Sequence, residues 1–230
     1  VVDDTRAFVC TFNLSLKYFT ETRDFGVVTT DPAQVAEIRA AFEADWEHGP
    51  FTPDDSTGLL WSPDNARDVY AAFIDAATTS LLVEHPKFVD VSILDRLTAA
   101  ADRGVQVKVL CGGLHGVSDT DILETTSSVR IMHRLGIKVH AIKHPKIHCK
   151  LLIADHARAL IGSMNIDRHA FELRRELGIV CDEPAIVKRV LDTFERDWEA
   201  SKKYEAPDPI EAVRNLPPCG GSDALVDAID

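Results

Sequence analysis

The feature of this sequence that most constrains the fold is an internal repeat with an offset of 152 residues. Residues 3–47 align without a gap on residues 155–199, and 16 of the 45 aligned positions are identical. The aligned segments end in the closely similar sequences FEADWE and FERDWE. Self-similarity on this scale indicates that one structural unit occurs more than once. The fold must therefore hold two copies of the same pattern of strands and helices.

The repeat divides the chain into three parts. We expect residues 1–50 to form the C-terminal part of a first unit, residues 51–204 a complete second unit, and residues 205–230 a loosely ordered tail. The junction at 48–58 is rich in turn-forming residues. At this offset the counterparts of His148 and Lys150 fall ahead of Val1. We therefore expect the first copy to be truncated at its N-terminus.

Composition narrows the class of protein. The apolar runs among the 230 residues are of strand length, far below the roughly 20 residues of a membrane span. A net charge of −12 lowers the expectation of broad binding to nucleic acid, although segment 143–150 gathers three Lys and two His. The five cysteines form no CxxC pair, as is typical of reduced thiols. These features favour a protein that is cytoplasmic or peripheral to the membrane.

The hydrophobic pattern of the second unit alternates between strands and helices. Strands are expected at 80–84, 105–110 and 137–142, and helices at 90–102 and from about 119 to 136. Ser62, Pro63 and Asp64 have the residue types of a helix start. Two strands, 146–154 and 159–164, then flank a tight turn, and a last helix starts at Pro184. The prediction is an α/β fold with a mostly parallel mixed sheet covered by helices.

One group of polar residues has the chemistry of a phosphate site. A strand through 146–154 presents His148 and Lys150 on the same face, and the adjacent strand ends in Ser163 and Asn165. An ammonium neutralises phosphate charge, hydroxyl and amide groups donate hydrogen bonds, and an imidazole attacks or transfers a proton. This chemistry needs neither a metal nor a cofactor. A zinc site on His140, His144 and His148 is disfavoured, because Pro145 breaks the helix that such spacing requires.

The spacing of these residues resembles a known signature. The pattern HxK(x)4D(x)6GSxN occurs at His148, Lys150, Asp155, Gly162, Ser163 and Asn165. It resembles the HKD motif of the phospholipase D superfamily, including the cardiolipin synthases, at every defined position. The resemblance covers essentially residues 1–200 and implies the phospholipase D-like fold. In the first copy Asp3, Thr11 and Asn13 occupy the matching positions, and Cys10 stands in place of the glycine.

The resemblance implies a phosphodiesterase that works through a phosphohistidine. Two motifs face each other across a pseudo-twofold axis, and one histidine attacks phosphorus while the other transfers protons. His148 resembles the proton-transferring partner, and Glu176 is expected to accept a hydrogen bond from its other ring nitrogen. Asp24 is expected to do the same for the missing histidine. The phosphate-binding residues implied are Lys150, Asn165, Ser163, Asn13 and Thr11, and the structural residues of the motif are Asp155, Asp3 and Gly162.

Several alternatives remain open. Asp155 lies where a hairpin reverses, so it is either a turn residue or a catalyst, and Glu176 is either an orienting residue or a surface carboxylate beside Arg174 and Arg175. Glu84 and His85 end a strand that could approach the site.

The leading function is cleavage or transfer of phosphatidyl groups of phospholipids. A nuclease of the same superfamily and a non-catalytic phosphate-binding fragment are the alternatives. The expected partners are a phosphodiester substrate and the missing N-terminal fragment or a homodimer mate.

Overall fold

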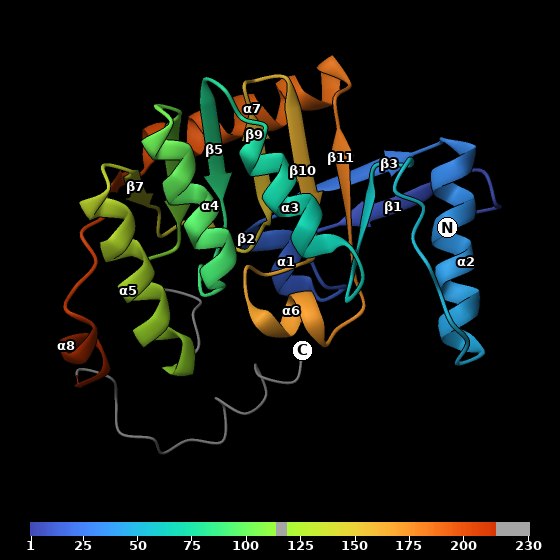
Figure 1. The fold of residues 1–230 in the computed structure, drawn as a ribbon, viewed down its shortest axis with the longest axis horizontal. Helices are drawn as coiled ribbons and strands as arrows, with labels where there is room; N and C mark the ends of the chain where they lie inside the picture. The colour runs from blue at the N-terminus through green and yellow to red at the C-terminus, as the bar shows by residue number, and fades with distance from the viewer. Residues whose placement is uncertain (114–118, 215–230) are drawn as a thin grey trace.

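A mixed sheet lies at the centre of the computed structural model, which describes residues 1–113 and 119–214 (Figure 1). Within those residues the sheet has eight strands in the order β12-β7-β6-β5-β9-β10-β11-β4. Strands β5 to β7 are parallel, and every other neighbouring pair is antiparallel. The strands are β4 Leu59–Ser62, β5 Ser80–Glu84, β6 Gln106–Cys111, β7 Lys138–Ala141, β9 Leu151–Ala154, β10 Arg158–Gly162, β11 Glu176–Cys181 and β12 Lys202–Lys203. The predicted α/β fold with a mixed sheet is confirmed. The expectation that this sheet is mostly parallel is wrong, because five of its seven neighbouring pairs are antiparallel, four of them around β9, β10 and β11.

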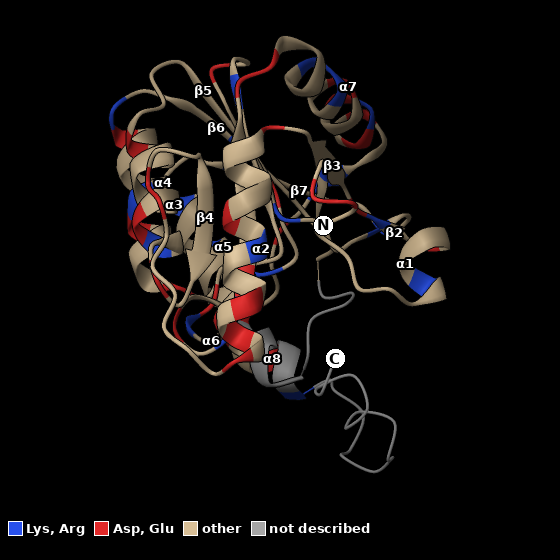
Figure 2. Ribbon diagram, turned by 90° about the vertical axis from the view of Figure 1, so that its right-hand side faces the viewer, with Lys and Arg blue, Asp and Glu red and all other residues tan. Residues whose placement is uncertain are grey.

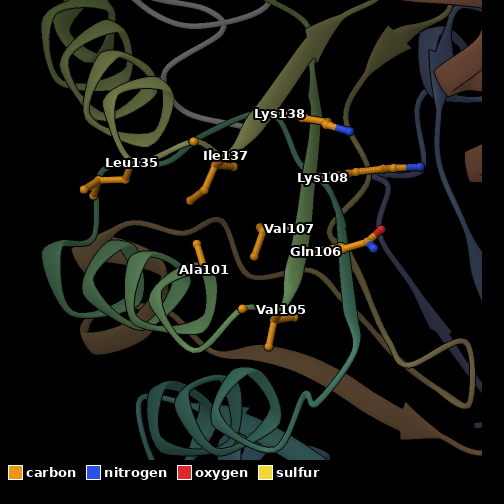
Figure 3. Close-up of a pocket in the computed structure, with 10 residues that line it drawn as sticks. Ala101, Val105, Gln106, Val107, Lys108, Leu135, Ile137 and Lys138 are labelled. Carbon is orange, nitrogen blue, oxygen red and sulfur yellow. The ribbon is translucent and has the colours of Figure 1, made fainter.

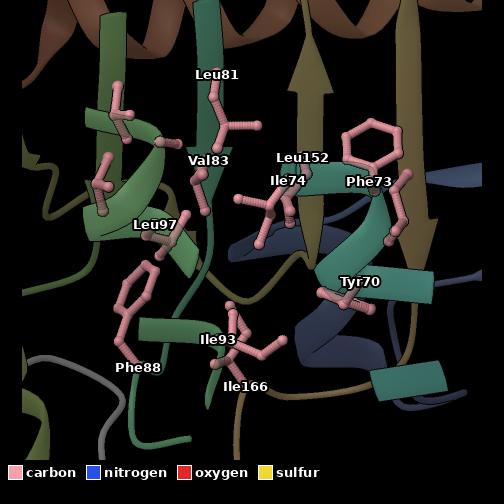
Figure 4. Packing of buried hydrophobic residues seen from close by; sticks show 14 of the residues in the cluster. Tyr70, Phe73, Ile74, Leu81, Val83, Phe88, Ile93, Leu97, Leu152 and Ile166 are labelled. Atoms are coloured by element: carbon pink, nitrogen blue, oxygen red, sulfur yellow. The ribbon is translucent and has the colours of Figure 1, made fainter. Parts of the chain in front are cut away.

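Helices cover both faces of this sheet. The helices α3 (Ala66–Asp75), α4 (Val91–Asp102) and α5 (Asp119–Arg134) cover one face, and α7 (Pro184–Ala200) covers the other (Figure 1). The parallel strands β5, β6 and β7 need crossover connections that return the chain to the opposite end of the sheet, and α4 and α5 supply them. Figure 4 shows the first core, where Leu81 and Val83 of β5 pack against Leu97 of α4. The second core joins Val187 and Phe194 of α7 to the opposite sheet face.

The start of α3 corrects one prediction. Ser62 does not cap a helix; it is the fully buried last residue of β4, where it pairs with Glu176 of β11. Helix α3 begins only at Ala66. Pairing with the edge of the sheet outweighs the local helix-start signal at this point, since tertiary context overrides propensity. By contrast, α4 starts after Asp90 as predicted, and the Asp90 carboxylate accepts a hydrogen bond from the backbone N–H of Ile93.

The internal repeat is visible as two hairpins with the same register. In one, β1 (Ala7–Cys10) pairs with β3 (Gly26–Thr29), so that Ala7 faces Thr29. In the other, β10 pairs with β11, and Ala159 faces Cys181 at the same offset of 152. Helix α1 (Leu16–Thr20) corresponds to α6 (Arg168–Glu172), and α2 (Pro32–Trp46) corresponds to α7. The sequence repeat is therefore also a repeat of strands and helices.

The segment before β9 differs from the predicted continuous strand. Only Lys146–Ile147 (β8) and Leu151–Ala154 (β9) are strands, and β8 pairs in parallel with β2 (Thr22–Arg23) of the first copy. Residues 148–150 connect β8 to β9. His148 and Lys150 therefore lie where the chain passes from the strand beside the first copy to the central sheet.

Two further regions complete the description. Helix α8 (Pro209–Arg214) lies within the segment 205–230, which is predicted to be a loose tail, and the part of that segment from 215 to 230 is outside the described residues. No helix in the described part of the chain is long and apolar enough to span a membrane. Figure 3 shows a shallow hollow at the start of β6 and β7, where the side chains of Lys108 and Lys138 extend to the same side of the sheet. The residues that line this hollow include none of the signature residues.

Candidate functional site

The imidazole of His148 lies between an acid and an amine. Its Nδ1 is 2.8 Å from Oδ1 of Asp24, and its Nε2 is 3.3 Å from Nζ of Lys150. A carboxylate accepts a proton and an ammonium donates one. This environment assigns the proton of the neutral ring to Nδ1 and leaves the lone pair of Nε2 beside the ammonium. Burial, together with nearby Lys150 and Lys17, lowers the pKa of His148 despite the opposing effect of Asp24.

Asp24 is held in place by two hydroxyl groups. Thr11 donates to its Oδ1 at 2.7 Å, and Thr22 donates to its Oδ2 at 2.5 Å. The Asp24 side chain is only 5% exposed, whereas that of His148 is 25% exposed. The carboxylate is thus fixed below the ring, and the ring remains accessible.

The prediction that Glu176 orients His148 is wrong, and so is the assignment of Asp24 to a missing histidine. Asp24, from the first copy, accepts the hydrogen bond from His148 of the second copy. The hydroxyl of Ser163 donates to Glu176 instead, and burial raises the pKa of that carboxyl. The acid and the histidine of a pair therefore come from different copies of the repeat.

Lys150 is a buried cation with three acceptors around it. Its ammonium lies 2.7 Å from the carbonyl oxygen of His148, 3.4 Å from the carbonyl oxygen of Thr11 and 3.3 Å from the His148 ring. Burial lowers its pKa to about 8, and the charges of Asp24 and Glu176 oppose that shift. The ammonium thus interacts electrostatically with a carboxylate of each copy, Asp24 and Glu176, and lies between the two halves of the site.

The two copies build matching pairs of a hydroxyl and a carboxylate. Thr11 with Asp24 corresponds to Ser163 with Glu176 at the offset of 152. The backbone N–H of Phe25 donates to the Thr11 hydroxyl, and the N–H of Leu177 donates to that of Ser163 in the same way. Ser163 and Thr11 therefore support the carboxylates, in addition to the phosphate-binding role that the sequence predicts.

The remaining motif residues divide into two groups. Asn165 is half-buried and Asn13 is exposed, and within the described ranges no side-chain hydrogen bond is found for either. Gly162 has a structural role, because a Cβ there would lie 2.9 Å from Cα of Gly178 on the neighbouring strand. The amides are thus available to a ligand, as the motif predicts.

Asp155 lies outside this group. Its carboxylate accepts hydrogen bonds from the backbone N–H groups of Thr78, Thr79 and Ser80, and these bonds hold its pKa well below the usual range. It occupies a turn position with φ of 54°, and Asp3 has the matching φ of 50°. Of the two interpretations left open by the sequence, the structural one fits these contacts.

Several residues that contact the site were not predicted from the sequence. The ring of Tyr18 lies 4.4 Å from that of His148, on helix α1, which projects from the body of the molecule (Figure 2). Arg23 precedes Asp24, and its guanidinium binds Asp197 of α7. The available signal was the identity of Arg23 with Arg175 and of Asp45 with Asp197 at the repeat offset.

Glu84 and His85, considered as residues that could approach the site, are both buried. The His85 ring lies 3.3 Å from the carbonyl oxygen of Met164, and burial lowers its pKa to about 3. Glu84 lies in electrostatic contact with Arg23 and Asp197. Both residues therefore support the site from behind.

The arrangement suits a phosphodiester ligand. A neutral imidazole and an ammonium group lie side by side, so a phosphoryl group there would meet a cation and a proton carrier together. The carboxylate behind the ring fixes the tautomer and stabilises the ring when it is charged.

Comparison with protein families identifies the region that holds these residues. The family model described as "Cardiolipin synthase, PLD-like domain" matches residues 70–198. The major cardiolipin synthase ClsA of Bacillus subtilis is 24% identical over 233 residues, which cover 89% of this chain and 48% of that protein. The chain spans about half the length of the curated relatives that it matches.

Solved structures share the fold. The phospholipase D family member Nuc from Salmonella typhimurium matches with a TM-score of 0.57 at 23% identity, over 64% of this chain and 95% of Nuc. Phosphatidylserine synthase from Haemophilus influenzae matches with a TM-score of 0.63 at 12% identity, over 88% of this chain and 62% of the synthase. At these identities the likeness concerns the fold alone.

Proposed function

Because the chain belongs to the family of cardiolipin synthase, PLD-like domains, we propose that it is part of a phosphodiesterase that cleaves or transfers phosphatidyl groups of phospholipids. The observation that carries this proposal is the position of the His148 ring between the Asp24 carboxylate and the Lys150 ammonium. Cardiolipin synthases among the relatives and a phosphatidylserine synthase among the similar folds support a phospholipid substrate.

The resemblance to phospholipase D-like enzymes, together with the contacts of these residues, supports the following roles. A histidine beside Glu176 attacks phosphorus, forms a phosphorus–nitrogen bond and displaces the leaving oxygen, which takes a proton from Nε2 of His148. In the second step His148 removes a proton from water or an acceptor alcohol, whose oxygen replaces the histidine on phosphorus. Lys150, Asn165 and Asn13 bind the phosphoryl oxygens. Asp24 stabilises the charged form of the His148 ring throughout.

The attacking histidine must come from a second unit. Glu176 is the structural counterpart of Asp24, yet in the described part of the chain only Ser163 is found to donate a hydrogen bond to its side chain. His148 of a second copy of this chain would already be bound to its own Asp24. We therefore favour a different His-x-Lys segment as the partner of Glu176, and a homodimer is the alternative.

Exposed apolar side chains support this partner. Phe8, Phe19 and Phe42 are 48%, 60% and 65% exposed, whereas their counterparts Leu160, Phe171 and Phe194 are at most 2% exposed. In the second copy those side chains pack against the rest of that copy. A second unit with a core like that of the second copy would cover Phe8, Phe19 and Phe42. Its counterpart of β9 would pair with the free edge of β1, as β9 pairs with β10 in the second copy.

A substrate panel tests the function. Phosphatidylglycerol, phosphatidylcholine and labelled single-stranded DNA are incubated with the chain alone and with an assembly that supplies a second His-x-Lys segment. We expect the assembly that supplies both histidines to turn over phospholipid. The His148→Gln variant should lose this turnover. The His169→Gln variant, which changes an exposed histidine of α6, should keep it.

Two observations favour a nuclease as the second candidate function. The chain carries a single intact motif, and its fold aligns with 95% of Nuc. Cleavage of DNA with both lipids left intact would therefore replace the lipid function by a nuclease function. Failure of every assembly to turn over any substrate would leave phosphate binding alone. His148-dependent turnover by a monomer of this chain would contradict the need for a second histidine. For any of these activities we propose a location in the cytoplasm or at the membrane surface.

A further inference from the structure

Two ion pairs join the copies of the repeat in a reciprocal way. Arg23 of the first copy binds Asp197 of the second through Nε at 2.5 Å and Nη2 at 3.0 Å. Arg175 of the second copy binds Asp45 of the first through the same two nitrogens, both at 3.0 Å. Arg175 is Arg23 shifted by 152 residues, and Asp197 is Asp45 shifted by the same number. The two pairs are thus equivalent by the internal repeat.

The two equivalent pairs have different surroundings. Asp197 is 7% exposed, whereas Asp45 is 42% exposed. Behind the first pair lies Glu84, which is fully buried and whose two carboxyl oxygens lack a hydrogen-bond partner in the described structure. A guanidinium fork bound to a carboxylate in both positions fixes direction as well as distance. Arg23 therefore has little freedom to turn away from Asp197.

Arg23 also holds the backbone of the signature segment. Its carbonyl oxygen accepts the backbone N–H of Cys149 at 2.8 Å and that of His148 at 3.3 Å. In the β2–β8 ladder Arg23 faces Ile147. The next residue, Asp24, binds the His148 ring. Consecutive residues of β2 and its continuation thus hold the main chain and the side chain of the same histidine.

We propose that Arg23 and Asp197 are positioning residues, which anchor β2 to α7 and so keep the Asp24 carboxylate on Nδ1 of His148. This inference rests on the proposed function, since it assigns a purpose to the orientation of His148. Neither residue touches the position of a phosphoryl group. Their effect is exerted through Asp24 and through the backbone of His148, which the Arg23 carbonyl oxygen holds.

The test observes the His148 ring directly by NMR of the chain with isotope-labelled histidine. The charged groups that influence this ring are Asp24, Lys150 and Lys17, and Tyr18 packs against it. In Asp24→Ala, which removes the acceptor, the hydrogen-bonded Nδ1 proton signal is lost and the titration midpoint moves to lower pH. We expect Asp197→Asn to lose the same signal and to shift the midpoint in the same direction. Asp45→Asn, the exposed counterpart, should leave both unchanged.

A second variant separates positioning from folding. Arg23→Met combined with Asp197→Leu removes both charges and leaves no lone buried ion, so it retains the fold where a single substitution fails. The proposal would be overturned if either variant, Asp197→Asn or the double variant, folds and its His148 keeps both the Nδ1 proton signal and the titration midpoint of the wild type. Turnover is measured separately. An inactive wild-type protein would count against the proposed function only, because the titration of His148 does not depend on catalysis.

Discussion

Nδ1 of His148 and Oδ1 of Asp24 lie 2.8 Å apart although the two residues are 124 positions apart in the chain. This contact joins the two copies of the repeat at the centre of the candidate site.

Replacing Asp24 tests the contact. Asp24→Asn keeps the size of the side chain and removes its charge, so we expect turnover by the active assembly to fall roughly 10²- to 10⁴-fold, the range for a lost orienting or proton-transfer group. The pKa of His148 falls further, because the Asp24 carboxylate is what raises it. The measurements are substrate turnover and NMR titration. Glu21→Gln, a change in an exposed acid nearby, is the control, and equal activity in both variants would contradict the assigned role.

The lowered pKa of Lys150 leads us to expect that phosphate binding depends on pH. Its pKa is lowered to about 8, so the ammonium loses its charge as pH rises through that value. Phosphate affinity, measured by calorimetry, should decline over the same interval after correction for phosphate ionisation.

Lys150→Met should weaken binding at pH 7 by roughly 10- to 100-fold, the effect of one charge-assisted hydrogen bond. Lys143→Met, in an exposed lysine, should leave binding unchanged. Undiminished affinity in Lys150→Met would remove this ammonium from the phosphate site.

Replacing Asp155 is expected to lower the stability of the fold without a direct effect on the reaction. Asp155→Ala removes the acceptor of three backbone N–H groups, so we expect the free energy of unfolding to fall by about 2–4 kcal/mol. Because folding lowers the pKa of Asp155, its contribution is present above the pKa of the unfolded chain and is lost as pH falls below about 4.

Urea denaturation at pH 7 and pH 3 measures both effects. Asp3→Ala is the matched control, because Asp3 holds the equivalent turn position but no hydrogen bond of its side chain is found in the described structure. An equal loss of stability in the two variants would show that the turn, and not the bonds to Thr78–Ser80, carries the effect.

The buried carboxyl of Glu84 is expected to make stability depend on pH in the sense opposite to that of Asp155. Burial raises its pKa from 4.5 to about 8. Between these values the folded protein binds more protons than the unfolded chain, so this group makes stability fall as pH rises from about 4.5 to about 8. Glu84→Gln removes that slope.

The corresponding experiment compares denaturation midpoints at pH 5 and pH 8. The advantage of Glu84→Gln over wild type should grow from the lower to the higher pH, whereas Glu47→Gln, on the surface, should differ from wild type by the same amount at both. A constant difference for Glu84→Gln would mean that its carboxyl is already ionised at pH 5.

Much of the fold was predictable from local patterns. The offset of 152 predicted the paired hairpins, since matching alternation produces matching registers, as Ala7 with Thr29 and Ala159 with Cys181 show. Asp90 was recognisable as a helix cap because the cap is a local contact. Strand β4 was missed because Ser62 and Pro63 also fit a helix start, and only pairing with β11 decides between the two.

The partners within the site were harder to predict. Spacing along the chain places Glu176 in the same copy as His148, but the ring lies against Asp24 of the other copy. Which copy faces which is settled by the packing of α7 and β2, where Asp197 meets Arg23. No local pattern contains that information, although the identical Arg and Asp at the repeat offset indicated a shared task.

The exchanged Arg–Asp pairs have a consequence for the origin of this chain. In a dimer with twofold symmetry, residue i of one subunit meets residue j of the other, and j meets i. Arg23 with Asp197 and Arg175 with Asp45 obey that rule within one polypeptide. Such a contact set is what gene duplication and fusion of a self-associating ancestor leave behind. Within this chain the two bonds select the partner half of the same molecule, as they would select an identical neighbour in a symmetric dimer.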